Sequence, residues 1–567
     1  MVPTETEFTQ SLTRPREVIQ SFFSDHVLIR DAVKTTEAHF RRVFSEPERR
    51  LRVPLLDAHS IHSLLRRSQS DEGRREGVLV RWRCMVQDTG FGCELFLATL
   101  KANGACVSGL YGAETMVDTA QDTLPEPENL TERTVVCAIS PPGEMAWCEQ
   151  LATGDSAQDT AGLALAMDKM DVGGTAEVQL CDRARIPVAE QPSITALVKC
   201  YDVDAAEGLR TTDMIDVVGL LDTSYLPNMD WEMAGTEGAA LFPCIHALYF
   251  ERSATDSTLL PLAERAAEAQ APPFSSLEET RASLIAYLSA CLGGDRLAAE
   301  YLLLALLAKI HLRRPGLAVG SLSLNISGMH GESKQHPALY HALTSLVPAL
   351  VPQRLALDVL NDPQLTLFVR SADTGIIAGR LELAQGTMVL VDEVCMGEGQ
   401  LQDHGVRNIR ALASVLQSHT LPYLFPFSEF HFDTDLNVVV LSAGKSLLPV
   451  DLHVPLRTSD GASSLDMYST EGMPLMPPEV YMAWRVYLLR ARHLEFQVTE
   501  PVSESIQHYF VEQRSVAGAD AYTQEDLQRD LGIARLLSVS HGASELTEPF
   551  WRDAVAMGKA RAARQPL

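Results

Sequence analysis

The sequence lacks the cysteine and hydrophobic patterns that mark several protein classes. Its ten cysteines are spread singly, with no CxxC pair and no pair of histidines at zinc-binding spacing. This argues against a zinc module and a disulfide framework, and it fits a reducing compartment. The strongest apolar run, Tyr301 to Ala308, is far shorter than the roughly 20 residues that cross a bilayer. Charged residues precede any apolar run at the N-terminus, which is unlike a signal peptide.

Basic residues are also scarce relative to acidic ones. The chain has 47 Lys and Arg against 74 Asp and Glu, a formal net charge of -27 at pH 7. Proteins that follow a nucleic-acid backbone use clustered Lys and Arg to displace counterions. The composition therefore argues against direct nucleic-acid binding, whereas it favours attraction to basic protein surfaces.

The first half of the chain predicts helices followed by a β domain. Val18, Ile19, Phe22 and Phe23 recur at helical spacing, so we expect a helical element within about residues 15–70. From Gly77 the period changes to that of strands. The predicted strands are GVLVRWRCMVQD, CELFLATL, RTVVCAIS, ITALVKCYDVD and DMIDVVGLLD. Five short strands with variable insertions favour an OB-like barrel, and a generic β-sandwich is the alternative.

The second half predicts alternating helices and strands. Predicted helices cover 281–292, 295–314 and 336–350, and predicted strands include SLSLNISG, TMVLVDE and NVVVLSAG. Short, continuously apolar strands are typical of a largely parallel sheet covered on both faces. Further helices are predicted in PPEVYMAWRVYLLRARHLEF, SESIQHYFVEQR and YTQEDLQRDLGIARLL, and a last one from about Thr547. In the third of these segments Thr523 and Asp526 have capping-box spacing, and Gly542 is a plausible stop.

These patterns predict a multidomain α+β protein. Its boundaries are a helical element at 1–75, an OB-like β domain at 76–260, an α/β domain at 276–460 and a helical domain at 476–567. Within the β domain, composition predicts loop insertions at about 110–132 and 150–194. Residues 225–275 also have the composition of loops, and the Ala, Glu and Pro-rich stretch at 260–275 predicts an interdomain linker.

One motif invites a nucleotide-binding hypothesis. The apolar strand Met388 to Glu393 ends in Asp392 and Glu393, the arrangement with which phosphate-handling ATPases hold magnesium and orient water. Taken alone the motif is weak, because apolar strands often end in solvated acids.

The neighbouring sequence argues against catalysis. A phosphate loop needs spaced glycines followed by Gly-Lys-Ser or Gly-Lys-Thr. After Gly328 the chain reads MHGESK, with Ser333 before Lys334. The actual Gly444-Lys445-Ser446 triplet follows the acidic strand instead of preceding it, and Val439 occupies the place of the first loop glycine.

No other enzyme signature occurs, since GxSxG and HExxH motifs are missing. His246 and His311 adjoin apolar runs and are interpreted as packing residues. Asp433 and Asp435 are interpreted as turn residues. The sequence therefore predicts a non-enzymatic protein with no catalytic, cofactor-binding or metal-binding residues and no cofactor.

Ordered segments from end to end resemble one known family. They are VRWRCMVQD, SPPGEMAW, LGGDRLAAEYLLLALL, SLSLNISG, MVLVDE through ALASVL, NVVVLSAGKSLLPVDLHVPL, YFVEQR and ARLLSVS. Together they resemble the mini-chromosome maintenance (MCM) complex-binding protein family. The resemblance is weakest at 110–130, 150–194 and 225–275.

The resemblance implies a chain built like a helicase subunit, with a degenerate AAA+-like α/β domain and a C-terminal helical lid. Residues 198–221 look like a barrel hairpin of such subunits, and the Asp392–Glu393 strand looks like a Walker B strand. Pro449 and Val450 stand where active subunits carry an arginine finger. Gln524, Glu525 and Asp526 replace the second arginine. Loss of these groups removes the charges that stabilise a transferring phosphate.

For function, the resemblance implies a nuclear partner of MCM helicase subunits, taking the place of the second subunit. The protein would assist assembly and stability of the complex, its unloading from chromatin in S phase, DNA replication and sister-chromatid cohesion. Chromatin association would be indirect, and no membrane association is expected. The alternative is a single-stranded-nucleic-acid-binding OB-fold protein, although aromatic residues are only 6% of the chain. Arg485, Arg490 and Arg492 form either a contact surface or a solvated basic helix face, and the basic tail GKARAARQ is a candidate import signal.

Overall fold

A computed structural model defines the architecture of the chain. It describes residues 3–25, 28–102, 105–116, 129–153, 178–225, 241–252, 254–314, 316–331, 336–372, 375–457, 465–466, 468–470, 473–517 and 522–564. The chain forms two compact units, residues 1–142 with 152–253 and residues 143–151 with 254–567. Among the described helices, none combines the length and the apolar character needed to cross a membrane. The four domain boundaries predicted from composition stay predictions.

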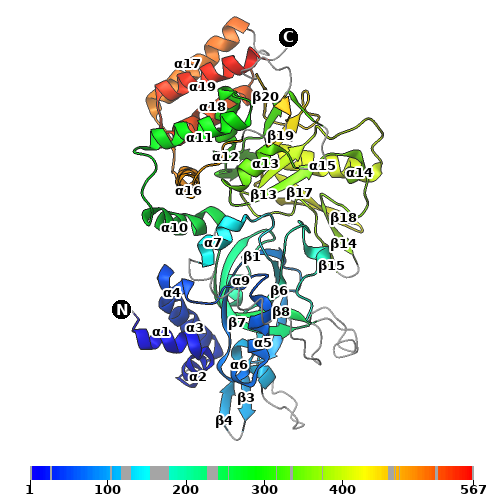
Figure 1. Ribbon diagram of the computed structural model, residues 1–567. Coiled ribbons are helices and arrows are strands. Elements are labelled where there is room, and N and C mark those ends of the chain that lie inside the picture. The colour runs from blue at the N-terminus through cyan, green and yellow to red at the C-terminus, as the bar shows by residue number, and fades with distance from the viewer. Residues whose placement is uncertain are drawn as a thin grey trace. The chain divides into compact units, whose positions relative to one another are not determined.

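The first unit begins with helices (Figure 1). They are α1 (Glu5–Thr13), α2 (Pro15–Asp25), α3 (Ile29–Val43), α4 (Pro47–Leu51), α5 (Ile61–Gln69) and α6 (Asp71–Glu76). Thr4 starts α1 with a capping box to Glu7, which satisfies amide groups that a helix end leaves unpaired. Phe8, Phe40 and Phe44 are fully buried, and their core cluster includes residues of the neighbouring strands. The helical prediction for residues 15–70 is confirmed.

The main strands of this unit form a sheet that closes on itself. They are β1 (Leu79–Asp88), β2 (Cys93–Leu97), β5 (Leu130–Ile139), β6 (Thr195–Cys200), β7 (Met214–Ser224) and β8 (Phe242–Arg252), with a separate hairpin of β3 (Thr99–Ala102) and β4 (Ala105–Ser108). The sheet order is β1-β7-β8-β6-β5-β2, and β1 also pairs with β5. That extra pairing closes β1, β7, β8, β6 and β5 into a ring. Within it β6 and β8 are parallel, whereas the other neighbours are antiparallel.

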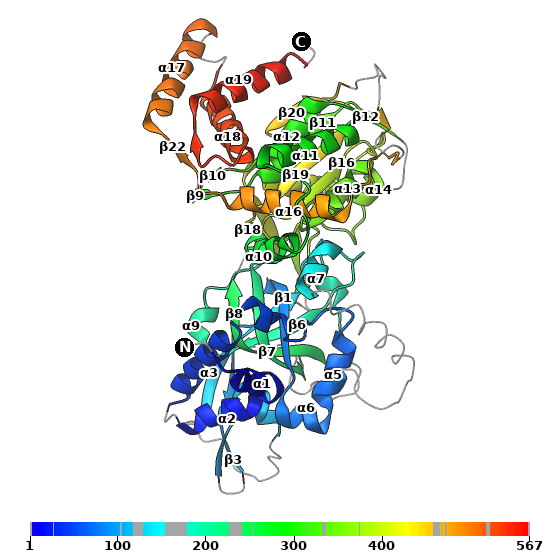
Figure 2. The same cartoon turned by 60° about the vertical axis from the view of Figure 1, so that its left-hand side comes forward.

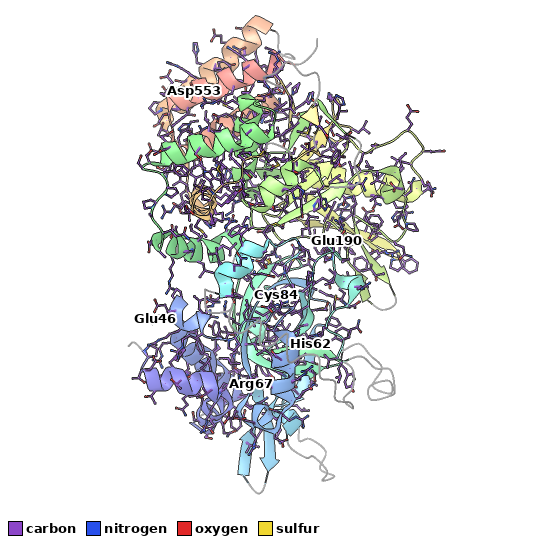
Figure 3. All side chains as sticks on the ribbon, in the orientation of Figure 1. Glu46, His62, Arg67, Cys84, Glu190 and Asp553 are labelled. Atoms are coloured by element: carbon purple, nitrogen blue, oxygen red, sulfur yellow. The ribbon has the colours of Figure 1, made fainter. Side chains whose placement is uncertain are left out.

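One core cluster draws side chains from all five ring strands. It includes Trp82 and Cys84 of β1, Val136 of β5, Val198 of β6 and Ile245 of β8, together with residues of β7. Side chains from every strand of a closed ring can converge only inside it, so this cluster fills the ring. Cys84, labelled in Figure 3, is fully buried there, and burial raises the pKa of its thiol. Every cysteine side chain that the structure describes is a free thiol.

Shorter helical turns complete the first unit and the start of the second. They are the 3-10 turns η1 (Leu110–Met116) and η4 (Arg183–Arg185), the short helix α9 (Val203–Ala206), and α7 (Ala146–Thr153).

A buried polar network lies outside the ring. The Tyr201 hydroxyl lies 2.8 Å from Nδ1 of His246, and it accepts hydrogen bonds from Arg133 Nη1 at 2.9 Å and from the Gly112 amide at 3.1 Å. Burial lowers the pKa of His246 to about 4, against the opposing influence of Asp222. His246 is therefore a neutral packing residue in the folded chain, as the sequence predicted.

We expect the folded protein to lose stability in mild acid because His246 of this network resists protonation. The unfolded chain binds a proton on His246 near pH 6.5, whereas the folded chain resists it down to about pH 4. Stability is therefore full above pH 6.5 and falls between pH 6.5 and 4, by up to about 3 kcal/mol from this group. His246→Asn keeps a polar partner for Tyr201 but cannot titrate. Denaturant unfolding across this range should show a smaller pH dependence in the variant, and an equal dependence would contradict this account.

Two loop predictions are wrong. Residues 242–252 form β8, and residues 255–268 form helix α10 (Thr255–Glu268), although both lie in the stretch predicted as loop and linker. β8 is buried on both faces over most of its length, so its sequence is largely apolar and lacks the alternation of a half-exposed strand. Pro261 lies inside α10, and because proline is unfavourable within helices, its presence favoured the wrong prediction of a linker.

The second unit is organised around a parallel sheet (Figure 2). Its strands are β11 (Leu324–Ser327), β13 (Leu350–Arg354), β16 (Met388–Asp392), β19 (Asn437–Ser442) and β20 (Leu452–Pro455), in the order β13-β16-β19-β11-β20. Every neighbouring pair is parallel. All residues of β11, β16 and β19 are buried. The prediction of a parallel α/β sheet from short, continuously apolar strands is confirmed.

Helices alternate with these strands along the chain. They are α11 (Leu277–Cys291), α12 (Arg296–Leu307), α13 (Ala338–Thr344), α14 (Leu357–Leu360), α15 (Asp403–Gln417) and α16 (Pro478–His493). The helix predicted to run to residue 314 ends at Leu307, so that prediction is wrong at its end. The chain turns there into a hairpin of β9 (Leu312–Arg314) and β10 (Leu317–Val319), in which the His311 amide donates to the Val319 carbonyl.

A second sheet and three terminal helices complete the unit. The sheet has the order β15-β14-β17-β18, from β14 (Val369–Ala372), β15 (Gly375–Ile377), β17 (Thr420–Phe425) and β18 (Ser428–Asp433). The helices α17 (Glu500–Ala517), α18 (Gln524–Ser540) and α19 (Glu548–Ala562) gather at the C-terminal end (Figures 1 and 2). Short strands pair as β12 (Met329–His330) with β21 (Leu465–Asp466), and β22 (Gln497–Val498) with β23 (Glu545–Leu546).

Candidate functional site

The acidic pair lies at the carboxyl edge of the parallel sheet. Asp392 is the last residue of β16 and Glu393 follows it, beside the ends of β13 and β19. Ligand sites of parallel sheets usually form at this edge. The motif found in the sequence therefore lies where a functional site is expected.

Asp392 is bonded to its own chain. Its side chain is buried, and its Oδ2 accepts a hydrogen bond from the Tyr468 hydroxyl at 2.7 Å. Its Oδ1 accepts from the Val394 amide at 3.1 Å. Burial and the neighbouring carboxylate raise the pKa of Tyr468, so the hydroxyl remains the proton donor. The solvated-terminus interpretation of Asp392 is wrong, because the carboxylate is enclosed and satisfied internally.

Glu393 holds the loop that follows β19. Its Oε2 accepts from the Ser446 hydroxyl at 2.5 Å, and its Oε1 accepts from the Leu447 amide at 2.8 Å. Asn325 of β11 supports the same loop, since its Oδ1 accepts from the Ser446 amide at 3.3 Å. Its amide nitrogen donates to the Ser442 hydroxyl at 2.6 Å. The Gly444-Lys445-Ser446 triplet is therefore anchored by Glu393 and Asn325 and lies beyond β19.

The segment after β11 lies against a distant part of the chain. Gly328 and Gly331 both have positive φ, and a Cβ on Gly331 would lie 2.5 Å from Cδ2 of Tyr468. The pairing of β12 with β21 brings residues 465–466 to the same place. Tyr468 thus fills the space between this segment and Asp392. Ser333 and Lys334 lie outside the described residues.

The remaining candidate residues have structural partners. Asp433 accepts from Arg313 Nη1 at 3.0 Å, and Asp435 is buried and accepts from the Ile310 amide at 3.2 Å. Burial lowers the pKa of His311. Pro449 and Val450 lie between β19 and β20. In α18, Asp526 forms the predicted capping box with Thr523, preceded in the helix by Gln524 and Glu525.

The arginines of α16 do not form one solvated face. Arg492 is paired with Asp256 at 2.7 Å, and both side chains are less than a tenth exposed. Arg485 lies over the Trp147 ring at 4.5 Å and donates to the Ser345 carbonyl. Arg490 is exposed and pairs with Glu264. The solvated-face interpretation therefore fits Arg490 but is wrong for Arg485 and Arg492.

Sequence reasoning found the acids but missed Tyr468. Tyr468 is separated from Asp392 by a long stretch of chain, and no local pattern marked it. Within the described residues, no cluster of three or more His, Cys, Asp or Glu side chains could hold a metal ion. As built, the site joins the ends of β11, β16 and β19 to the segment around Tyr468.

Fold and site define a multidomain α+β protein in which the acids at a parallel-sheet edge are bonded to the chain's own side chains and amides. Comparison with known proteins identifies the family. The model of the mini-chromosome maintenance replisome factor family matches residues 40–170 and 166–565. Because the match extends over most of the chain, the chain belongs to this family.

Individual relatives agree with this assignment, and each is called a mini-chromosome maintenance complex-binding protein. The chain is 29% identical to the Danio rerio protein over 400 residues, which cover 67% of this chain and 63% of that protein. It is 31% identical to the Salmo salar protein over 390 residues, 64% of this chain and 61% of that protein. These two matches span less than two thirds of the relatives. Identity to the Mus musculus protein is 24% over 635 aligned positions, covering 98% of this chain and 97% of that protein.

Proposed function

We propose that the chain is a non-catalytic binding partner of the MCM replicative helicase. The observation that carries this proposal is the match of the family model over residues 40–170 and 166–565, together with relatives named for binding the MCM complex. In this proposal the chain acts in the nucleus and associates with MCM subunits in place of the second subunit. It assists assembly and stability of the complex, its unloading from chromatin in S phase, DNA replication and sister-chromatid cohesion.

The architecture supports a helicase-subunit-like scaffold. The closed ring β1-β7-β8-β6-β5 with its parallel β6–β8 pair supports an OB-like barrel. The fully parallel order β13-β16-β19-β11-β20, followed by α17–α19, supports a degenerate AAA+-like domain with a helical lid. A scaffold of this kind can serve as a binding surface without chemistry, since function depends on sites and not on the fold.

The internal hydrogen bonds of Asp392 and Glu393 support the non-enzymatic part of the proposal. Tyr468 bonds to Asp392, and Ser446 and the Leu447 amide bond to Glu393. For a nucleotide-bound metal and an attacking water to reach these carboxylates, the bonds would have to break first. We propose that the acid pair now serves to hold the loops at the sheet edge.

Affinity purification tests this proposal. We expect the tagged full-length chain to retain MCM subunits without the second subunit, and to show no ATP hydrolysis above background when purified alone. A chain carrying Asp392→Ala and Glu393→Ala is the matched control for the hydrolysis assay. Failure to retain any MCM subunit would refute the proposal, and hydrolysis that the double substitution abolishes would refute its non-enzymatic part. Steeply salt-dependent binding to single-stranded DNA would favour the alternative of a nucleic-acid-binding barrel.

A further inference from the structure

The β17–β18 hairpin exposes three phenylalanines within six residues. Phe427, in the two-residue turn, is 103% exposed, Phe430 is 54% exposed and Phe432 is 42% exposed. Every residue of β18 is exposed. Isolated exposed apolar side chains are ordinary on protein surfaces, but a contiguous apolar patch marks an interaction site.

Two of the three rings, those of Phe430 and Phe432, are held in place before any partner arrives. Phe430 packs edge-on against Phe425 with ring centroids 5.6 Å apart, and Phe432 packs against Tyr423 at 4.4 Å. Tyr423 is buried and donates its hydroxyl hydrogen to Glu382 Oε1 at 3.2 Å, which fixes the ring against which Phe432 packs. Little freedom of the Phe430 and Phe432 side chains therefore remains to be lost on binding, a property of residues that dominate interfaces.

The outer edge of β18 offers backbone groups to a partner. Among the described residues β18 pairs only with β17, and it contains neither Lys nor Pro, which commonly protect edge strands. The Thr434 amide donates to the His419 carbonyl at 2.9 Å, so these two residues form a hydrogen-bonded pair. From this pair, hydrogen-bonded and non-hydrogen-bonded pairs alternate along β17 and β18. By that alternation Pro422 and His431 form a non-hydrogen-bonded pair, so the backbone N–H of His431 points to the outer edge. The amides of Glu429 and Asp433 point the same way.

The charges around the phenylalanines are acidic. No Lys or Arg occurs from Thr420 to Asn437, whereas Glu429 and Asp433 lie on the opposite face of β18 from Phe430 and Phe432. Arg313, from outside the hairpin, lies 3.0 Å from Asp433. A surface that stacks single-stranded nucleic acid combines aromatics with a basic groove, and this hairpin has the opposite charge. It fits an extended protein segment with apolar and basic side chains.

We propose that the β17–β18 hairpin is a docking surface for an MCM subunit, which adds an extended apolar and basic segment to the free edge of β18. Backbone hydrogen bonds to the outward groups of β18 give affinity, and Phe427, Phe430 and Phe432 select the apolar side chains. Glu429 and Asp433 favour basic side chains on the same segment. This inference rests on the proposed function, since it names the surface through which the chain would bind its partner.

Serine substitution of the phenylalanines tests the apolar part of the surface. A chain with Phe427→Ser, Phe430→Ser and Phe432→Ser should bind purified MCM subunits at least about tenfold more weakly than the unchanged chain. Leu475→Ser is the matched control, because Leu475 is 92% exposed and lies outside the hairpin. Circular dichroism should match between the variants and show that both fold, whereas the triple variant should melt at a somewhat lower temperature because it loses the ring contacts of Phe430 and Phe432.

Proline substitution at one position tests the backbone part. His431→Pro removes the outward N–H without removing a bond of the β17–β18 ladder, whereas His431→Ala removes the side chain and keeps the N–H. Binding should fall at least about fivefold for the proline variant relative to the alanine variant. Equal binding by the two would overturn strand addition.

The outcomes separate this inference from the proposed function. Binding by the unchanged chain together with undiminished binding by the triple serine variant refutes the hairpin surface and leaves the proposed function standing. Failure of the unchanged chain to bind any MCM subunit refutes both. Binding to single-stranded DNA that the serine substitutions abolish would show that the hairpin contacts nucleic acid, and this also refutes the inference.

Discussion

Replacing Trp484 by alanine is expected to lower the free energy of unfolding of the second unit by about 3–5 kcal/mol. Trp484 lies in α16 and is fully buried. Its ring packs 4.9 Å from that of Tyr287 of α11 and 5.7 Å from that of Tyr481. Removal of the indole leaves a cavity at the contact between α11 and α16, which the surrounding helices cannot fully close.

Trp484→Phe is the matched control for this prediction. The indole N–H is buried and has no hydrogen-bond partner among the described residues. Phenylalanine removes that N–H and retains most of the aromatic packing, so its cost should be clearly smaller than that of alanine. Denaturant unfolding followed by circular dichroism measures both variants. Equal losses for alanine and phenylalanine would show that ring packing is not what this residue contributes.

Asp295→Ala is expected to destabilise the second unit by about 3–5 kcal/mol as well. The Asp295 side chain is 1% exposed and caps α12 by accepting from the Ala298 amide at 3.1 Å. It also accepts from the Arg457 amide at 2.8 Å and from two nitrogens of Arg564, at 2.5 and 3.1 Å. The substitution removes the cap and leaves the largely buried Arg564 guanidinium without this carboxylate.

The ion pair can be separated from the cap by a second substitution. Arg564→Ala in the Asp295→Ala background should cost much less than Arg564→Ala alone, because the shared interaction is already lost. Burial opposes the charged form of Asp295, but the bonds from Arg564 and the amides outweigh it and lower the pKa. The stability that Asp295 contributes is therefore full above about pH 4 and lost as pH falls through its lowered pKa. Additive costs of the two substitutions would contradict the pairing.

Local patterns were enough to predict much of the architecture. The runs MVLV and VVVL form the apolar middle of β16 and β19, and both are central strands buried on two faces. Thr523 and Asp526 predicted the start of α18 by their spacing, and Gly542 follows its end with a φ of 73°. Each of these signals lies within a few residues of the element it specifies, so no tertiary information was needed.

The predictions failed where the determining contact is remote or a local signal misleads. Pro261 marked α10 as a linker, and β8 lacks the alternation of a half-exposed strand. Tyr468 reaches Asp392 only because β12 pairs with β21, which no sequence period reveals. The phenylalanines of β18 entered no sequence prediction, because no local pattern shows that a hairpin exposes them.

The closed ring of the first unit also bears on how the chain tolerates length variation. Because β1 pairs with both β5 and β7, every neighbouring pair of ring strands is bonded directly. Residues added to a connection between ring strands, such as that between β5 and β6, need not interrupt any of these ladders, and each doubling of a flexible connection costs only about 0.6 kcal/mol. The alignment with the Mus musculus protein takes 635 positions although this chain has 567 residues, so the two sequences differ by insertions and deletions. Evolution can therefore lengthen or shorten such connections while the barrel keeps its register.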